Sequence, residues 1–204
     1  MVLDFEMVIS SRLFLSHVNS EDELVMVVRS HQDLDELLAQ AISEALIEMH
    51  FLDVERIPFS LKVELGVALG KIEGDMRSPL LKLNAIRNEF AHDSKTKLTE
   101  KHVRDFYNVF VFSDPKMHDF VHRPEETDPI TLIRDLISIL FVRLRSNVEK
   151  IRDQKLWNLA LDEEARELLG DSAIRYKDHP SRLESHESIT KRFERLKKER
   201  DKKE

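Results

Sequence analysis

Apolar residues recur every three to four positions along much of the chain, and this periodicity restricts the fold more than any other feature. It is clearest between residues 130 and 151, where it lasts for about six helical turns. Its members are Ile130, Ile133, Ile137, Leu140, Leu144, Val148 and Ile151. The 204 residues include only 4 Gly and 6 Pro, and 35% are charged, a composition that favours long helices over a sheet. The sequence therefore predicts an all-α protein.

Several helices with apolar stripes are expected to pack as an antiparallel helical bundle. They are Ser20–Met49, which opens with a capping box of Ser20 and Glu23, then Ser60–Ile72, Pro79–Ala91, Thr99–Phe112 and Asp128–Ile151. A further helix is expected between Trp157 and Leu169, with Gly170 as its stop. The predicted organisation is a short N-terminal helix within 1–19, a bundle domain over 20–170, and a polar, partly basic tail over 171–204.

Charge and composition exclude several classes of function. The formal net charge is −7, so no general positive field attracts nucleic acid, and an RNA contact needs a local basic patch. The chain has no Cys, hence no disulfide, thiolate nucleophile or thiolate metal site. The first ten residues carry acids where a signal peptide needs bases, and charges interrupt the best apolar run, residues 130–144. We expect a cytoplasmic protein without a membrane span, and no cofactor is predicted.

One stretch, residues 80–93, combines a predicted core face with an unusual polar row. Its core stripe is Leu80, Leu83, Ile86 and Phe90, at helical spacing. Asn84, Asn88 and His92 form a row beside that stripe, each four positions from the next. Arg87 falls at the edge of the apolar stripe, where a guanidinium needs a partner or a ligand because an unpaired buried charge is costly.

This stretch contains Arg87-Asn88-Glu89-Phe90-Ala91-His92, or R-N-x-x-x-H. The motif resembles the signature of the HEPN superfamily, and the segment 59–92 is similar to the mannitol operon repressor family within it. The resemblance covers about residues 20–112. It implies a helical bundle, metal-independent RNA cleavage, and a homodimer formed through the motif helix. It leaves open a toxin or defence setting with a protein antitoxin or regulator as partner.

The residue types of the motif suit RNA cleavage without a metal. A His removes the proton from a ribose 2′-hydroxyl, which attacks the adjacent phosphate and leaves a 2′,3′-cyclic phosphate and a 5′-hydroxyl. An Arg stays charged and matches the phosphoryl oxygens on which charge builds. The predicted catalytic residues are therefore Arg87 and His92, with Asn88 to orient the imidazole or to bind phosphate.

The spacing within the motif favours two copies of the chain. Arg87 and His92 are five residues apart and so diverge by roughly 140° around one helix. Two motif helices facing each other across a two-fold axis bring an Arg from one chain near a His from the other. An isologous homodimer with RNA as its substrate is the expected assembly.

Supporting residues are expected on the neighbouring helices. His31 and Asp35 lie one turn apart inside the apolar stripe of the first long helix. Two interpretations stay open: a His–Asp pair satisfied locally or at a solvent edge, or two residues that line the same pocket as Arg87. Glu64 is predicted to pair with Arg87, because it falls inside a predicted apolar stripe and needs a cation. Asn84 completes the supporting set. The predicted stripe that includes Glu64 consists of Leu61, Leu65, Ala68 and Ile72.

Two other segments allow both a structural and a functional interpretation. His118 and His122 resemble part of a zinc-binding H-E-x-x-H helix, but Asp replaces Glu and no third ligand is evident, so no metal site is predicted. Residues 191–204 read KRFERLKKERDKKE, which indicates a solvated, fraying helix, or a tail that touches RNA phosphates.

The competing functional class is a regulatory or interaction protein without catalysis. The mannitol operon repressor family is named for transcriptional control, although no helix-turn-helix or other DNA-reading module is evident in the sequence. In this alternative, Arg87 and Glu64 form a structural bridge and the protein acts by binding partners.

Overall fold

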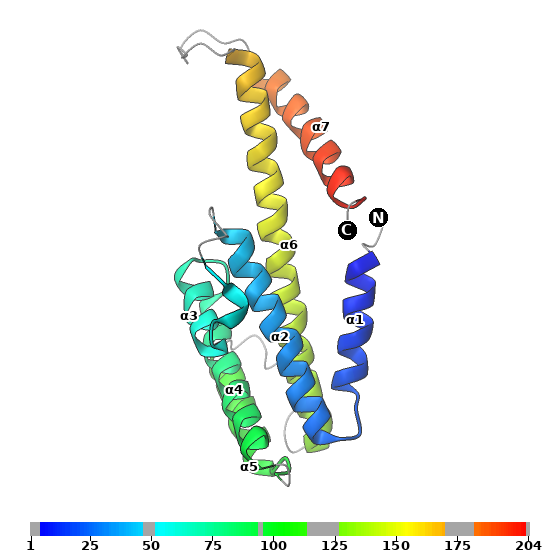
Figure 1. Ribbon diagram of the computed structural model, residues 1–204, viewed down its shortest axis with the longest axis vertical. Helices are drawn as coiled ribbons and strands as arrows, with labels where there is room; N and C mark the ends of the chain where they lie inside the picture. The colour runs from blue at the N-terminus through cyan, green and yellow to red at the C-terminus, as the bar shows by residue number, and fades with distance from the viewer. Residues whose placement is uncertain (1–4, 47–51, 94–95, 114–126, 170–181, 203–204) are drawn as a thin grey trace. The chain divides into compact units, whose positions relative to one another are not determined.

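The protein is helical throughout the part of the chain that its computed structural model describes, residues 5–46, 52–93, 96–113, 127–169 and 182–202 (Figure 1). The α-helices are α1 Phe5–Val18, α2 Glu23–Ala45, α3 Phe59–Ala68, α4 Arg77–His92, α5 Glu100–Ser113, α6 Pro129–Leu169 and α7 Arg182–Arg200. Two short 3-10 helices, η2 Val54–Arg56 and η3 Gly74–Met76, precede α3 and α4. No strand occurs in these ranges, which confirms the prediction of an all-α protein. Within the same ranges, no helix is both long and apolar enough to cross a membrane.

The chain divides into two compact units, and its longest helix contributes to both. One unit is Ile9–Val148, and the other combines Met1–Val8 with Glu149–Glu204. The boundaries expected at residues 19 and 170 stay a prediction. The predicted end of the helix near Ile151 is wrong, because α6 runs unbroken for 41 residues. Because neither Gly nor Pro occurs between residues 151 and 157, nothing in the sequence interrupts the helix there.

Helices α2, α3 and α4 pack against one another in the unit Ile9–Val148, and α5 packs on α4 (Figure 1). The rings of Phe14 in α1 and Phe141 in α6 stack with centroids 3.8 Å apart. The predicted core stripe of the motif helix is confirmed, because its four residues are at most 2% exposed. Fully buried side chains from the other helices complete this core: Met26, Val27, Leu34, Leu38, Ala41, Ile42, Val63, Phe106, Leu132, Ile133, Leu136, Ile137, Leu140 and Leu144.

Two helices start where the sequence predicts, and the cap of a third differs from the predicted one. Thr99 Oγ1 accepts a hydrogen bond from the amide of His102 at the start of α5, as expected of a cap. Asp128 accepts from the amide of Thr131 and caps α6. For α2 the predicted capping box of Ser20 and Glu23 is wrong, since Asp22 accepts from the amides of residues 24 and 25. The side chain of Glu23 instead accepts from the amide of Leu98, 2.7 Å away, and so ties α2 to the start of α5.

Helix α3 buries a different face from the one predicted. Leu61 is 49% exposed and Ala68 is also exposed, whereas Lys62 is only 1% exposed. The buried residues of this helix are Phe59, Lys62, Val63 and Gly66. The helix is thus rotated by about one residue relative to the predicted stripe, which is roughly 100°. This rotation carries the amine of Lys62 to α2 and turns Glu64 away from the core.

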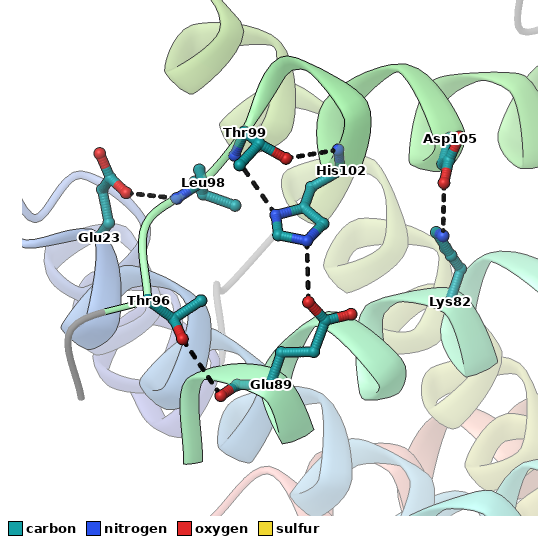
Figure 2. A network of polar contacts seen from close by, with 8 residues as sticks. All are labelled: Glu23, Lys82, Glu89, Thr96, Leu98, Thr99, His102 and Asp105. Atoms are coloured by element: carbon teal, nitrogen blue, oxygen red, sulfur yellow. Dashed lines mark hydrogen bonds and ion pairs between the residues drawn. The ribbon is translucent and has the colours of Figure 1, made fainter. Parts of the chain in front are cut away.

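Polar contacts fix α5 against α4 near the C-terminal end of the motif helix (Figure 2). His102 Nδ1 accepts from the amide of Thr99, 3.3 Å away, so the ring carries its proton on Nε2 and donates it to Glu89, 2.9 Å away. One helical turn farther along, Lys82 of α4 donates to Asp105 of α5 at 3.1 Å. These contacts hold α4 against α5 without involving Arg87 or His92.

In the second unit, basic residues of α7 pair with acids of α6. Arg192 lies 2.8 Å from Glu164, and Arg195 lies 2.6 Å from Glu163. Lys197 and Arg200 both contact Asp153, at 2.9 and 3.3 Å. Part of the basic character of residues 191–204 is therefore neutralised within the unit, and this reduces the charge that α7 offers to an RNA phosphate.

Candidate functional site

A partly open polar cavity of about 460 Å³ lies between α2, the start of α3 and the C-terminal half of α4, all in the unit Ile9–Val148. It is lined by Val28, His31, Gln32, Asp35, Pro58, Phe59, Ser60, Asn84, Arg87 and Asn88. Helical spacing explains the set: His31 and Asp35 are one turn apart on α2, and Asn84, Arg87 and Asn88 follow one side of α4. The cavity thus collects most of the residues that the sequence singles out.

Arg87 reaches this cavity without a carboxylate partner among the described residues. Its Nη1 donates to Asn88 Oδ1 at 3.3 Å, and its Nε is buried without a hydrogen-bond partner. Burial of a guanidinium nitrogen that has no hydrogen-bond partner is unfavourable unless a ligand supplies that partner. A cation held in this way is suited to bind an anion.

The predicted pairing of Arg87 with Glu64 is wrong. Glu64 accepts hydrogen bonds from Arg77, at the other end of α4, with Arg77 Nε 2.9 Å from Glu64 Oε2. These hydrogen bonds lower the pKa of Glu64 below its ordinary value. Both side chains are nearly half exposed, at 45% and 44%, so the pair belongs to the surface and contributes little to stability. The cause is the rotation of α3, which turns Glu64 away from the core.

His31 and Asp35 do not form the His–Asp pair that was one of the two interpretations. His31 Nε2 lies 3.0 Å from Asn84 Oδ1, and the imidazole packs on the ring of Phe59 with centroids 4.1 Å apart. The pKa of His31 is lowered to about 4, mainly by burial and also by the positive charge of Arg87, while the hydrogen bond to Asn84 opposes both effects. His31 is therefore neutral at physiological pH. Both His31 and Asp35 line the cavity that Arg87 reaches, as the second interpretation holds.

Asp35 is held by a lysine that sequence reasoning did not select. Lys62 Nζ lies 2.8 Å from each of the two carboxylate oxygens of Asp35. The lysine side chain is 1% exposed and the carboxylate is 32% exposed, so the charge of the ammonium is buried and the aspartate reaches solvent. Lys62 lies three residues after Phe59, and this spacing places it on the buried face of α3. Its partner is 27 residues away in sequence, which is why no local pattern identifies it.

His92 lies outside this cavity. It is the last residue of α4 and is exposed, whereas the lining residues from α4 end at Asn88. The divergence of about 140° that the sequence predicts between Arg87 and His92 agrees with this separation. Of the predicted site residues, Arg87, Asn88, Asn84, His31 and Asp35 come together, whereas His92 and Glu64 do not join them.

Among the described residues, no group of three or more His, Cys, Asp or Glu side chains is arranged to hold a metal ion. The segment with His118 and His122 lies outside the described residues.

Comparisons with known proteins give no match. Neither a protein-family model, nor a curated protein, nor a solved structure matches this chain.

Proposed function

We propose that the chain is an endoribonuclease that cleaves single-stranded or loop RNA without a metal, in the manner that its resemblance to HEPN proteins implies. The observation that carries the proposal is Arg87, a cation on the wall of an open polar cavity whose Nε has no hydrogen-bond partner. An arginine used only as a structural bridge is expected to end on a carboxylate. The absence of such a partner among the described residues favours a role in binding a ligand.

The chemistry assigned to the cavity begins with the phosphate. The guanidinium of Arg87 binds the phosphoryl oxygens and stabilises the charge that grows on them as the 2′-oxygen attacks. Asn88 already accepts from Arg87, so its amide nitrogen is available to donate to the same phosphate. The side-chain amides of Asn84 and Gln32 also line the cavity and offer hydrogen bonds to the ribose. Because the attack needs only a proton acceptor and a cation, no metal enters the reaction.

The assembly that we propose is a homodimer of HEPN-like antiparallel bundles. Ala85, Asn88 and His92 are all exposed and follow one another at spacings of three and four residues, so they form a continuous row on α4. A second copy that meets this row across a two-fold axis brings its own His92 towards the cavity. The resemblance assigns proton transfer to this histidine.

The test compares purified wild-type protein with two arginine variants on a mixed RNA pool, each with and without EDTA. We expect cleavage in EDTA, with 2′,3′-cyclic phosphate ends, and a loss of at least about 100-fold in Arg87→Ala. Arg77→Ala is the matched control, because Arg77 is on the same helix but outside the cavity. Equal residual cleavage by wild type and Arg87→Ala would mean contamination and end the proposal. Cleavage lost only in EDTA would point to a metal site instead.

A non-catalytic regulator or interaction module is the second candidate, and the exposed position of His92 favours it. In that case the row on α4 binds a protein partner, such as an antitoxin or another regulator. The same experiment separates the two functions, since a protein of this class binds partners but produces no cyclic phosphate.

A further inference from the structure

The histidine that shares a cavity with Arg87 is His31, not the histidine of the motif. His31 comes from α2 and lines the same 460 Å³ cavity as Arg87 and Asn88 of α4. His92 is exposed at the end of α4 and is not among the residues that line the cavity. We propose that His31 accepts the proton of the attacking 2′-hydroxyl, an inference that rests on the proposed ribonuclease function.

Asn84 fixes the tautomer that this role requires. An amide oxygen only accepts hydrogen bonds, so His31 Nε2 carries a proton and donates it to Asn84 Oδ1 at 3.0 Å. In the neutral ring Nδ1 is then the acceptor. No described residue hydrogen-bonds to Nδ1, and this nitrogen is not among the fully buried atoms that lack a partner. Nδ1 therefore retains accessible surface and an unused lone pair.

Packing holds the imidazole in one orientation. Its face lies against Phe59, with the planes 35° apart and the centroids separated by 4.1 Å, and only 7% of the residue is exposed. A proton acceptor placed beside a phosphate-binding cation needs such restraint, because a small displacement of the base lowers the rate strongly. Asn84 and Phe59 are positioning residues in this scheme, since they act through His31.

The proposed step balances with water as the only other reactant. His31 Nδ1 takes the 2′-hydroxyl proton while the 2′-oxygen forms a bond to phosphorus, and Arg87 stabilises the charge on the phosphoryl oxygens. The bond from phosphorus to the 5′-oxygen breaks, its electron pair stays on that oxygen, and the oxygen takes a proton from water. The resulting hydroxide removes the proton from the His31 imidazolium, which restores the neutral ring.

The charges around His31 decide the pH range in which it can act. Arg87 on α4 and Lys62 on α3 lower its pKa, Asp35 on α2 raises it, and burial is the largest cause of its low value of about 4. His31 is thus deprotonated over the whole neutral range, and its low pKa also makes it a weak base. A phosphate bound to Arg87 offsets the effect of that guanidinium and raises the pKa of His31 in the complex.

The experiment measures kcat/KM for RNA cleavage by the wild-type protein from pH 5 to 7.5, a test that needs no variant. With His31 as the base, the acidic side of the profile stays flat, because its pKa in the free protein lies below this range. A base with the unperturbed histidine value of about 6.5 produces a fall of about 30-fold between pH 7.5 and 5. Such a fall, abolished in His92→Gln, would overturn the inference.

A variant of His31 completes the test. We expect His31→Gln to lower kcat by at least about 100-fold while KM changes little. Circular dichroism and RNA affinity serve as checks that His31→Gln is folded. Wild-type kcat in His31→Gln would overturn the role of His31 but leave the proposed function intact if Arg87→Ala is still inactive. Absence of any cleavage that depends on Arg87 would overturn both.

Discussion

Lys62 donates to both carboxylate oxygens of Asp35, each at 2.8 Å, from a position that is 1% exposed. The pair joins α3 to α2, and Asp35 also lines the cavity that Arg87 reaches. An ammonium buried to this extent is tolerated only because its partner is charged and well placed. The face of α3 that brings Lys62 to Asp35 also brings Phe59 against His31.

The first prediction concerns this pair. Asp35→Asn should lower the free energy of unfolding by about 3 kcal/mol, because the change leaves the buried ammonium of Lys62 without a counter-charge. Adding Lys62→Met should recover most of the loss, since an apolar chain of similar length then fills the site. Chemical denaturation of the two single variants and the double variant measures the coupling between them. Glu64→Ala is the control and should change stability little, because Glu64 pairs with Arg77 in solvent. A coupling energy near zero between Asp35 and Lys62 would contradict the assignment.

The second prediction concerns the pH dependence of stability. The pKa of His31 falls from an ordinary 6.5 in the unfolded chain to about 4 in the folded one. The unfolded state therefore binds more protons between these pH values, and stability is lost as pH drops from 6.5 towards 4. The contribution of His31 is about 3 kcal/mol, fully present above pH 6.5.

Urea denaturation of the wild type and of His31→Gln between pH 4 and 7.5 measures this effect. The difference between the two curves isolates His31 from the other titrating groups. If the free energy of unfolding of both proteins changes with pH in the same way, burial does not hold the imidazole neutral.

The third prediction distinguishes the effect of the positive charge of Arg87 from the effect of its planar guanidinium geometry. Arg87→Lys should recover less than about a tenth of the wild-type cleavage rate, since an ammonium does not reproduce the planar fork that matches phosphate. It also lacks the Nε that is buried without a partner in the free protein. Steady-state rates on the same RNA pool, with Arg77→Lys as control, test this. Full activity in Arg87→Lys would indicate that only a positive charge is needed.

The fourth prediction concerns the start of α5. Thr99→Ala should cost about 1 kcal/mol, because it removes the hydroxyl that accepts from the amide of His102. Thr99→Ser keeps this hydroxyl and should cost much less. Thermal unfolding of both variants is the measurement, and equal melting temperatures for the two would argue against the cap shown in Figure 2.

The amino-acid sequence by itself determined the helical class, the core face of α4 and the starting points of α5 and α6. Leu80, Leu83, Ile86 and Phe90 could be placed because an amphipathic helix records its buried side in its own spacing. Thr99 and Asp128 could be placed at helix starts because residues of these types bond to amides within the next turn. The same local geometry put Asn84, Arg87 and Asn88 on one side of α4.

Only the tertiary structure decided how α3 is turned and which residues of α2 face α4. The α3 segment FSLKVELGVA has apolar residues on every side, so its spacing does not reveal the buried face. In the structure that face includes Lys62, whose partner Asp35 lies 27 positions away. For this reason the sequence pairs Glu64 with Arg87, whereas the structure pairs it with Arg77. His31 contacts Asn84, which lies 53 positions away in the sequence. Such contacts depend on the rotation of whole helices about their axes, which is a property of their packing and not of any single segment.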